Sequence, residues 1–355
     1  MNLQRVDPSL RNRWMETIHN DILTPLYFAN VEEFAYSNEN PFVPNEEKLN
    51  LLRLKDFAAF NYEKGELRDF MLHIFSDFIG LFHLDIKKLQ RFIFAVSENY
   101  QNNPFHNYFH ATSVTQMVFA IGEKAEKYER FLTPLDRLSL LLSSYGHDLN
   151  HPGVTNALMV NSRHPLAITY NDASVLENHH AATLINFLEL SGCDIFSDFS
   201  LQDKNYLRRI IIPTILGTDM AKHKTVMSDY TNIFTIGYDK NNQDHRQSVM
   251  SMVLHSADVG NPCYKFELAT VWSLRIIQEF NQQVMQEETR GLPVSEFLRI
   301  GNDIRKIKQN QMGFIDGFIY PLWKLLALHM QEAQEYVEAI ELNRKLWEEL
   351  ENLDS

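Results

Sequence analysis

Cysteine is scarce in this chain of 355 residues, with only Cys193 and Cys263 present. Two cysteines cannot build the disulfide framework of a small secreted domain, so the composition favours a reducing compartment, and we expect a cytoplasmic protein. No stretch approaches the roughly 18 consecutive apolar residues that a membrane span requires. The opening residues, MNLQRVD, also lack the apolar segment of a signal peptide. We therefore expect neither a membrane span nor a secreted fold.

Basic residues are also in short supply. Lysine and arginine number 33 against 46 aspartates and glutamates, which gives a formal net charge of −13. A chain of this charge is a poor partner for a nucleic-acid backbone, and we expect no nucleic-acid binding. The same charge repels any phosphate-bearing ligand, so a site for one must carry its own local positive charge.

Strand-like alternation of apolar and polar residues is nearly absent, and residues 231–237 form the only short candidate. Helical spacing is common instead. Leu268, Trp272, Ile276 and Phe280 follow one another in steps of four, which places them on one face of a helix. The run 133–136, Thr-Pro-Leu-Asp, is typical of a helix start, with a capping threonine and a proline in the first turn. The sequence predicts an all-α protein.

No glycine- or serine-rich linker, internal repeat or change of composition divides the chain. We predict an N-terminal helical layer or linker over residues 1–45, where Pro41 and Pro44 interrupt the chain. The main domain is expected over residues 46–340. Residues 341–355, which are rich in charge, are expected to form the end of a C-terminal helix.

Five metal-binding side chains carry the strongest chemical signal in the sequence: His106, His110, His147, Asp148 and Asp258. His106 and His110 are four residues apart, so both imidazoles can face one cavity. His147 and Asp148 are neighbours, and adjacent helical side chains diverge by about 100°. They can therefore approach a metal centre from different sides. Imidazole suits zinc, and carboxylate suits zinc or magnesium. Such a set predicts a metal-dependent phosphohydrolase.

The His106 and His110 pair, Asp258 and the nearby Glu177 also have a purely structural interpretation, whereas the motif of His147 and Asp148 is less easily a coincidence. Two histidines four residues apart often occur by chance on a protein surface or in its core, without binding a metal. Glu177 lies three residues after Ser174, which is the spacing of a capping box. Asp258 stands just before Gly260-Asn261-Pro262, so it could serve only to form a turn.

The chain resembles the catalytic domain of the class I cyclic nucleotide phosphodiesterases, which belong to the wider group of His-Asp (HD-type) metal phosphohydrolases. The resemblance covers about residues 60–335 and rests on six motifs in the order of the family. These are His106-Asn107-x-x-His110-Ala111, His147-Asp148-x-x-His151-Pro152-Gly153-x-x-Asn156, Leu176-Glu177-Asn178-His179-His180, Thr218-Asp219-Met220, Leu254-His255-x-Ala257-Asp258, and Gln311-x-Gly313-Phe314-Ile315-Asp316 followed by Pro321-Leu322-Trp323.

The resemblance implies a compact domain of about sixteen helices in three subdomains, with the site at their junction. It makes His110, His147, Asp148 and Asp258 the ligands of a tightly held zinc ion. Asp148 would also bridge to a second ion, Mg²⁺ or Mn²⁺, whose remaining ligands are mostly waters. Three further residues would hold those waters: His151, Glu177 and Thr218.

The resemblance also assigns the substrate side of the site. His106 would be the general acid, which protonates the leaving 3′ oxygen after attack by a hydroxide that the two metal ions activate. Gln311 would bond the edge of the base, and Phe314 and Ile276 would enclose its faces. Three more residues would complete the substrate site: Asn261, Phe105 and Asn107.

Hydrolysis of a 3′,5′-cyclic nucleotide to the 5′-monophosphate is the expected reaction, with cyclic AMP preferred and cyclic GMP also accepted. An HD-type hydrolase of another nucleotide and a non-catalytic cyclic nucleotide-binding module are the alternatives. The small-molecule nucleotide is the expected partner, and a homodimer is one arrangement that the sequence leaves open. Family members usually carry regulatory regions, and we expect these to lie outside this sequence.

Overall fold

The computed structural model describes residues 42–125, 128–190 and 192–350. These residues contain helices and connecting turns, and no strand is found among them, which confirms the all-α prediction. The sixteen α-helices of this part of the chain are α2 (Glu46–Leu52), α3 (Lys64–Ile74), α4 (Ser76–Phe82), α5 (Ile86–Glu98), α6 (Tyr108–Lys124), α7 (Pro134–Gly146), α8 (Asn156–Asn161), α9 (Pro165–Thr169), α10 (Val175–Glu189), α11 (Leu201–Leu216), α12 (His223–Thr235), α13 (Gln243–Asp258), α14 (Phe266–Arg290), α15 (Ile304–Phe314), α16 (Tyr320–His329) and α17 (Gln334–Glu349).

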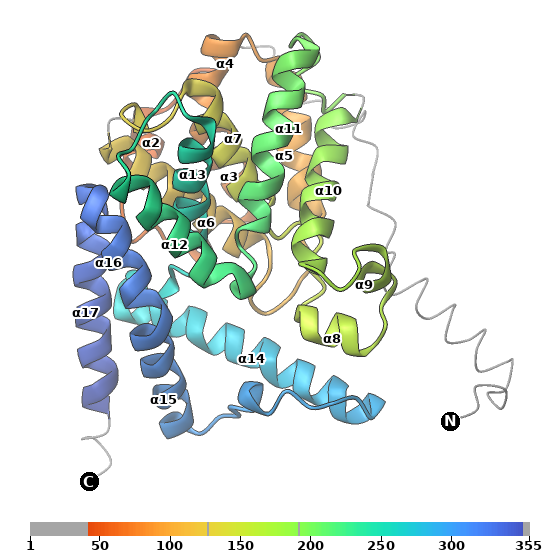
Figure 1. Cartoon of the computed structure of the whole chain (residues 1–355), viewed down its shortest axis with the longest axis vertical. Coiled ribbons are helices and arrows are strands. Elements are labelled where there is room, and N and C mark those ends of the chain that lie inside the picture. Colours follow the sequence, from red (N-terminus) through yellow and green to blue (C-terminus); the bar gives the residue numbers. More distant parts are fainter. Residues whose placement is uncertain (1–41, 126–127, 191, 351–355) are drawn as a thin grey trace, which may run out of the picture.

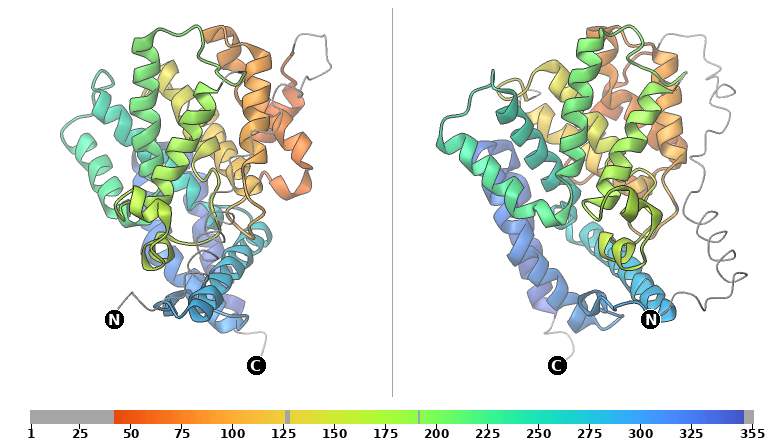
Figure 2. Two further views of the ribbon diagram at one scale, coloured as in Figure 1. Left: turned by 90° about the vertical axis from the view of Figure 1, so that its right-hand side faces the viewer. Right: turned by 45° about the vertical axis from the view of Figure 1, so that its right-hand side comes forward.

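A bundle of long helices forms the centre of the molecule (Figure 1). In it α7 packs against α6 and α11, α11 packs against α10, and α13 contacts α6, α7 and α11. The longest helix, α14, runs across the lower end of this bundle, and α15, α16 and α17 lie along one side. Both views in Figure 2 keep α14 below the bundle. The site lies where the ends of α6, α7 and α13 meet α14.

Helix α6 is the most enclosed of these elements, because almost every residue from Tyr108 to Gly122 is buried. A helix that is apolar or buried all round belongs inside a protein. Its first turn is fixed by Asn107, whose side-chain oxygen accepts hydrogen bonds from the backbone N–H groups of Phe109 and His110. This cap therefore sets the position of His110 on the first turn of a buried helix.

The apolar core forms one large cluster that extends through the bundle and reaches α14 to α17. A smaller, separate cluster lies among α8, α9 and α10 and contains Val154, Leu158, Met159, Ala167, Val175 and Leu176. Both cysteines are buried and free. Within the described residues, no helix combines the length and hydrophobicity of a membrane span.

The predicted start of α7 is confirmed: Thr133 caps the helix, Pro134 is its first residue, and Asp136 completes a capping box. The strand candidate at residues 231–237 is wrong, because α12 extends to Thr235. Val226, Tyr230 and Ile233 recur every three or four residues and are buried, so packing of this face favours helix over strand.

The domain boundaries stay predictions. Residues 1–41 of the expected N-terminal layer lie outside the described residues, as do residues 351–355 of the charged end. Helix α17 runs continuously from Gln334 to Glu349, across the proposed boundary at residues 340 and 341. The three expected subdomains likewise stay a prediction, since a single cluster forms most of the core.

A buried ion pair links three helices of the bundle. Asp136 is fully buried and caps α7. It accepts hydrogen bonds from Arg246 of α13 at 2.8 Å and from Tyr206 of α11 at 2.6 Å.

Asp136→Ala should lower the free energy of unfolding by about 3–5 kcal/mol, because it leaves Arg246 buried without its counter-charge. Denaturant unfolding measures this effect. Asp316→Ala breaks the exposed pair with Arg344, and should cost at most about 1 kcal/mol. Equal losses in the two variants would contradict the assignment.

Candidate active site

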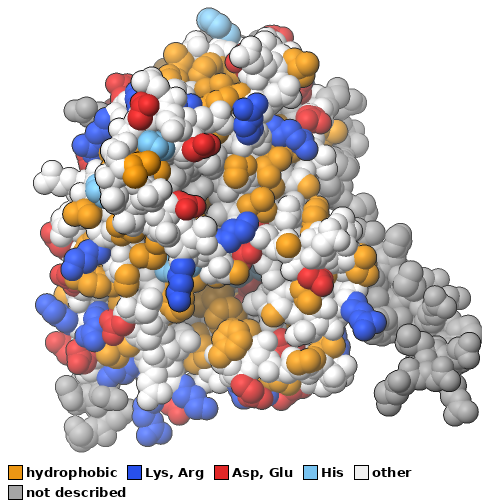
Figure 3. Space-filling view, in the orientation of Figure 1, with side chains coloured by type: hydrophobic (Ala, Val, Ile, Leu, Met, Phe, Trp, Pro, Cys, Tyr) orange, Lys and Arg blue, Asp and Glu red, His pale blue; other side chains and the backbone are white. Residues whose placement is uncertain are grey.

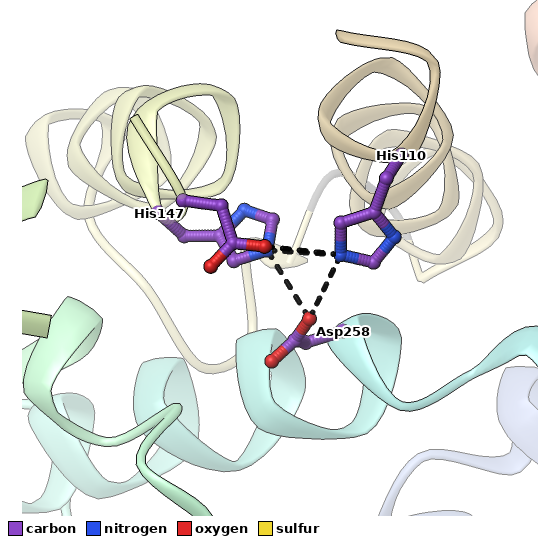
Figure 4. A group of neighbouring side chains, drawn as sticks. His110, His147 and Asp258 are labelled. Atoms are coloured by element: carbon purple, nitrogen blue, oxygen red, sulfur yellow. Dashed lines mark hydrogen bonds and ion pairs between the residues drawn. The ribbon is translucent and has the colours of Figure 1, made fainter. Parts of the chain in front are cut away.

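Two histidines and two aspartates converge at the centre of the site, and Figure 4 shows three of them, His110, His147 and Asp258, pointing toward one another. His110 lies on α6, His147 directly follows α7 with Asp148 next to it, and Asp258 is the last residue of α13. Nε2 of His110 and Nε2 of His147 are 3.3 Å apart, and each lies 3.1 Å from Oδ1 of Asp258. Oδ2 of Asp148 is 3.4 Å from the first nitrogen and 3.3 Å from the second.

These spacings fit one divalent cation. Nitrogen and oxygen ligands lie about 2.0–2.2 Å from zinc, so at the usual coordination angles they are about 3.0–3.5 Å from one another. Nδ1 of His147 is 2.8 Å from the carbonyl oxygen of Ser144 and donates its proton there, which leaves Nε2 with a free lone pair toward the cluster. Oδ2 of Asp148 is buried without a hydrogen-bond partner. A cation would satisfy this orphaned acceptor.

Electrostatics keep both carboxylates ionised. Burial raises the pKa of Asp148 and of Asp258, but the charge of His147, whose own pKa the two carboxylates raise despite burial, holds both pKa values below their usual range before a cation binds. A cation would take the place of the proton on Nε2 of His147 and keep both carboxylates ionised. Ionised carboxylates are the form that binds a cation.

A second group of possible ligands includes the other carboxylate oxygen of Asp148, Oδ1. Its other members are His151 and His180, and Nε2 of His180 lies 3.8 Å from Oδ1 of Asp148. Nδ1 of His151 accepts the N–H of Gly153 at 3.0 Å, so the neutral ring carries its proton on Nε2. Burial, and then the charge of His106, keep the pKa of His151 well below its usual value. A neutral His151 can donate one hydrogen bond to a water or a ligand.

Glu177 lies on the wall of the same cavity, and it is not part of a capping box. Ser174 makes no side-chain cap and instead donates its hydroxyl to Asp219, while both oxygens of Glu177 accept from Nδ2 of Asn156. Burial and the charge of Asp219 raise the pKa of Glu177 to about 7. Thr218 lines the same side of the cavity.

His106 stands apart from the four-residue cluster. Its Nδ1 is hydrogen-bonded to Oε1 of Glu279 on α14, and its ring stacks on His151 with a centroid distance of 3.9 Å. Oε2 of Glu279 also accepts the backbone N–H groups of Phe105 and His106 at 2.9 and 3.1 Å. Glu279 therefore fixes both the ring and the backbone of His106.

Glu279 controls the protonation of His106. Burial lowers the pKa of His106, but the charge of Glu279 and the hydrogen bond to it more than offset this and raise the pKa to about 9. Burial raises the pKa of Glu279, but the opposite charge of His106 lowers it to about 2. Near neutral pH the pair is therefore imidazolium and carboxylate, with a proton on Nε2 of His106 that Glu279 does not use.

A cavity of about 360 Å³ opens beside these groups and is called the site cavity below. The face in Figure 3 is hollowed above α14, and hydrophobic side chains line the depth of the hollow. The predicted site residues that line the site cavity are Phe105, His106, Asp148, His151, Glu177, Thr218, Asp258, Asn261, Ile276 and Phe314. Ile276 of α14 and Phe314 of α15 therefore add apolar surface to the same cavity that Asp148 and Asp258 line.

Two predicted substrate residues do not line the site cavity. Asn107 is buried and uses its side chain to cap α6 and to bond the carbonyl oxygens of Asn103 and Pro104. Gln311 is also buried, one turn before Phe314, and its Oε1 lies 2.8 Å from the hydroxyl of Ser273. His110 and His147 lie behind the cavity wall, as ligands of a buried cation can.

Sequence reasoning missed three residues that shape this site. Glu279 fixes His106, His180 faces Asp148, and Gln283 joins α14 to Thr155 through hydrogen bonds of 2.8 and 2.9 Å. The helical spacing of α14 contained a signal, because Ile276, Glu279 and Gln283 recur every three or four residues. An acidic residue on the same predicted helix face as Ile276 was the signal in the sequence.

Comparison with known proteins identifies the family. The family profile described as 3'5'-cyclic nucleotide phosphodiesterase matches residues 105–340. The chain is 33% identical to the 3',5'-cyclic-nucleotide phosphodiesterase regA of Dictyostelium discoideum, over 95% of this chain and 44% of that protein. It is 31% identical to the human high affinity cGMP-specific 3',5'-cyclic phosphodiesterase 9A, over 87% of this chain and 52% of that protein. The chain belongs to the 3',5'-cyclic nucleotide phosphodiesterase family, as its motifs predicted.

Relatives named for different cyclic nucleotides match about equally well. The 3',5'-cyclic-AMP phosphodiesterase 4C of Rattus norvegicus is 34% identical over 77% of this chain and 52% of that protein. The chain thus spans about half the length of these relatives. Among solved structures, the phosphodiesterase domain of the RhoPDE fusion protein from the choanoflagellate Salpingoeca rosetta superimposes with a TM-score of 0.80 at 34% identity, covering 86% of this chain and 97% of that one.

The pair of His106 and Glu279 predicts a particular pH dependence. Glu279→Gln removes the charge that raises the pKa of His106, so that pKa should fall from about 9 toward or below its ordinary value of about 6.5. A reaction that needs protonated His106 should then lose activity above neutral pH, with the alkaline limb of the kcat/KM profile moved down by about 2 pH units. Glu287→Gln makes the same charge change two turns along α14, where Glu287 bonds Ser295, and should leave the limb in place. An unmoved limb in Glu279→Gln would contradict the assignment.

Proposed function

We propose that this chain hydrolyses 3',5'-cyclic nucleotides to nucleoside 5'-monophosphates. The observation that carries the proposal is the joining of three features in one cavity. These are a cation-binding cluster at its floor, a histidine that keeps a proton near neutral pH, and an apolar slot between α14 and α15. Family membership supports the same reaction. So does the likeness to the S. rosetta phosphodiesterase domain, since this chain covers 97% of that domain.

The cluster of His110, His147, Asp148 and Asp258 would hold Zn²⁺. Mg²⁺ or Mn²⁺ would lie beyond Asp148, where His151, Glu177 and Thr218 can bond the waters such an ion keeps. When bound, two such ions activate a water and offset the charge of the phosphoryl oxygens. Their positive charge would also offset the electrostatic repulsion between a phosphate group and a chain of net charge −13.

His106 would donate the proton that the departing 3′ oxygen needs. An alkoxide is a strong base, so its departure is aided by an acid that is protonated near neutral pH and placed at the leaving group. The carboxylate of Glu279 keeps His106 in this form and holds its Nδ1, so that Nε2–H is the donor left for the site cavity that His106 lines. Stacking on His151 restricts rotation of the ring.

The base would lie between Phe314 and Ile276, which supply two apolar walls of the site cavity. Asn261 and Phe105 line the same space and would contact the nucleotide, and Asn107 would act through the turn that carries Phe105 and His106. Gln311 is the proposed partner of the base edge. It lies one turn from Phe314 on α15, so a small movement of this helix end would bring its amide to the cavity.

The surroundings of Gln311 support acceptance of both bases. The hydroxyl of Ser273 can donate to Oε1 of Gln311 while Nε2 of Gln311 donates to Oδ1 of Asn310. It can instead donate to the carbonyl oxygen of Ala269 and accept a hydrogen bond from the flipped amide, provided that the amide of Asn310 flips as well. Each amide orientation therefore has a partner, and each presents a different pattern to a purine. We infer that cyclic AMP is preferred and cyclic GMP is also hydrolysed.

Replacement of Phe314 tests this base site. Phe314→Ala should raise KM for both nucleotides by roughly 5- to 150-fold, since a stacked aromatic side chain is worth about 1–3 kcal/mol per base. Steady-state hydrolysis of cyclic AMP and cyclic GMP, followed by separation of the 5'-monophosphates, measures this change. Phe297→Ala removes an exposed phenylalanine outside the cavity and should change neither KM.

Two results would count against the proposal. If the unmodified protein leaves both nucleotides intact when supplied with zinc and magnesium, the proposed reaction is wrong. If one nucleotide is hydrolysed and the other is untouched at millimolar concentration, the amide of Gln311 is fixed and the dual selectivity is wrong.

A further inference from the structure

A second cavity lies beside the site cavity and is the larger of the two, at about 590 Å³. It is bounded by the loop that precedes α8, by α8, by the start of α9, and by the end of α14 with Leu292. The two cavities share Val154, while His179 lines the second cavity and its neighbour His180 lines the site cavity. Ligand sites in proteins commonly occupy about 300–1,000 Å³.

Apolar side chains make up much of the wall of the second cavity. Leu158 and Met159 of α8, Leu166 of α9 and Leu292 after α14 face this space. Leu158 and Met159 belong to the small apolar cluster that is separate from the main core. An apolar wall of this kind can bind the hydrocarbon or ring portion of a small molecule.

His164 supplies a hydrogen-bond donor that has no partner. Its side chain lines the second cavity and is 6% exposed, and Nδ1 accepts the N–H of Leu166 at 3.0 Å. Burial, and then the charges of His179 and Arg290, lower the pKa of His164 to about 4, so the ring is neutral near pH 7. The single ring proton therefore lies on Nε2, which is buried and unpartnered. Such a donor calls for an acceptor.

The charge of the second cavity is opposite to that of the chain. Arg163 and Arg290 line it, and the guanidinium group of neither makes a hydrogen bond or an ion pair with another described residue. No aspartate or glutamate is among the described residues that line it, although the chain carries a net charge of −13. The nearest acids on α14 are already used, because Glu287 bonds Ser295 and Glu288 pairs with Arg299.

We propose that the second cavity binds a small amphiphilic anion. Its carboxylate or phosphate group would bond Arg163, Arg290 and Nε2–H of His164, and its apolar portion would lie against Leu158 and Met159. Guanidinium groups suit both oxyanions, because they can donate two parallel hydrogen bonds. This site is separate from the proposed hydrolytic site and does not depend on the reaction proposed there.

Direct binding tests the proposal without any measurement of turnover. Isothermal titration calorimetry of the intact chain would use three probes with the same alkyl length: decanoate, decyl phosphate and decan-1-ol. We expect one saturable site for an anion and much weaker binding of the uncharged alcohol. Tighter binding of decanoate or of decyl phosphate identifies which oxyanion the site prefers.

Variants locate the site within the chain. Arg163→Gln with Arg290→Gln should weaken binding of the anion at least about tenfold, because each removes a charged hydrogen-bond donor. Leu292→Trp should abolish binding by filling the rim. Arg305→Gln makes one of the same charge changes at an exposed position outside the cavity, and should leave affinity unchanged.

The proposal is overturned if neither anion saturates at millimolar concentration, or if decan-1-ol binds as tightly as both anions. It is also overturned if the double arginine variant and Leu292→Trp, both shown to be folded by their circular dichroism and thermal unfolding, bind the anions with unchanged affinity. Hydrolysis of cyclic nucleotides can succeed or fail independently of each of these outcomes.

Discussion

The structure depends on bringing two buried carboxylates and two buried imidazoles to one point. Asp148 follows the end of α7, and Asp258, 110 positions later in the sequence, is the last residue of α13. Removing two charges of the same sign from water is costly unless opposite charge lies between them. The geometry of the four ligand atoms fits a divalent cation as the source of that charge, with the two imidazoles as neutral ligands. The ends of α6, α7 and α13 are thereby fixed relative to one another.

Helix α14 adds the second layer of this arrangement. From one face it presents Ile276 to the site cavity, Glu279 to His106 and Gln283 to Thr155. A single helix therefore carries the proposed wall for the base, sets the protonation of the proposed acid and positions the loop at Thr155. The C-terminal helix supports the same region, since Asn343 of α17 bonds the carbonyl oxygens of Pro262 and Tyr264 at 2.7 Å each. Asn261 lies in that turn.

The metal-binding cluster and the helical class could be predicted because both leave local signals. His110, His147, Asp148 and Asp258 are chemically distinctive, and their motifs keep a recognisable order. Glu279 was missed because glutamate on a helix is usually a solvated side chain, and only the fold shows that it is buried against His106. Residues 231–237 were misread because a short run of β-branched and aromatic residues has no sequence signal for the packing that makes it helical. The second cavity depends on α9 and the end of α14 meeting, which no local pattern encodes.

The central claim is that a cation held by the four-residue cluster is required for turnover. Its most direct test is to measure zinc content and cyclic nucleotide hydrolysis together, in the unmodified chain and in Asp258→Asn, before and after dialysis against a chelator. The account predicts that the unmodified chain loses zinc and activity in parallel and regains both when zinc and magnesium are returned. Asp258→Asn should retain its helical content but fail to regain either, because an amide is a much weaker ligand than a carboxylate. Full turnover by a chain without bound metal, or by Asp258→Asn, would contradict the account.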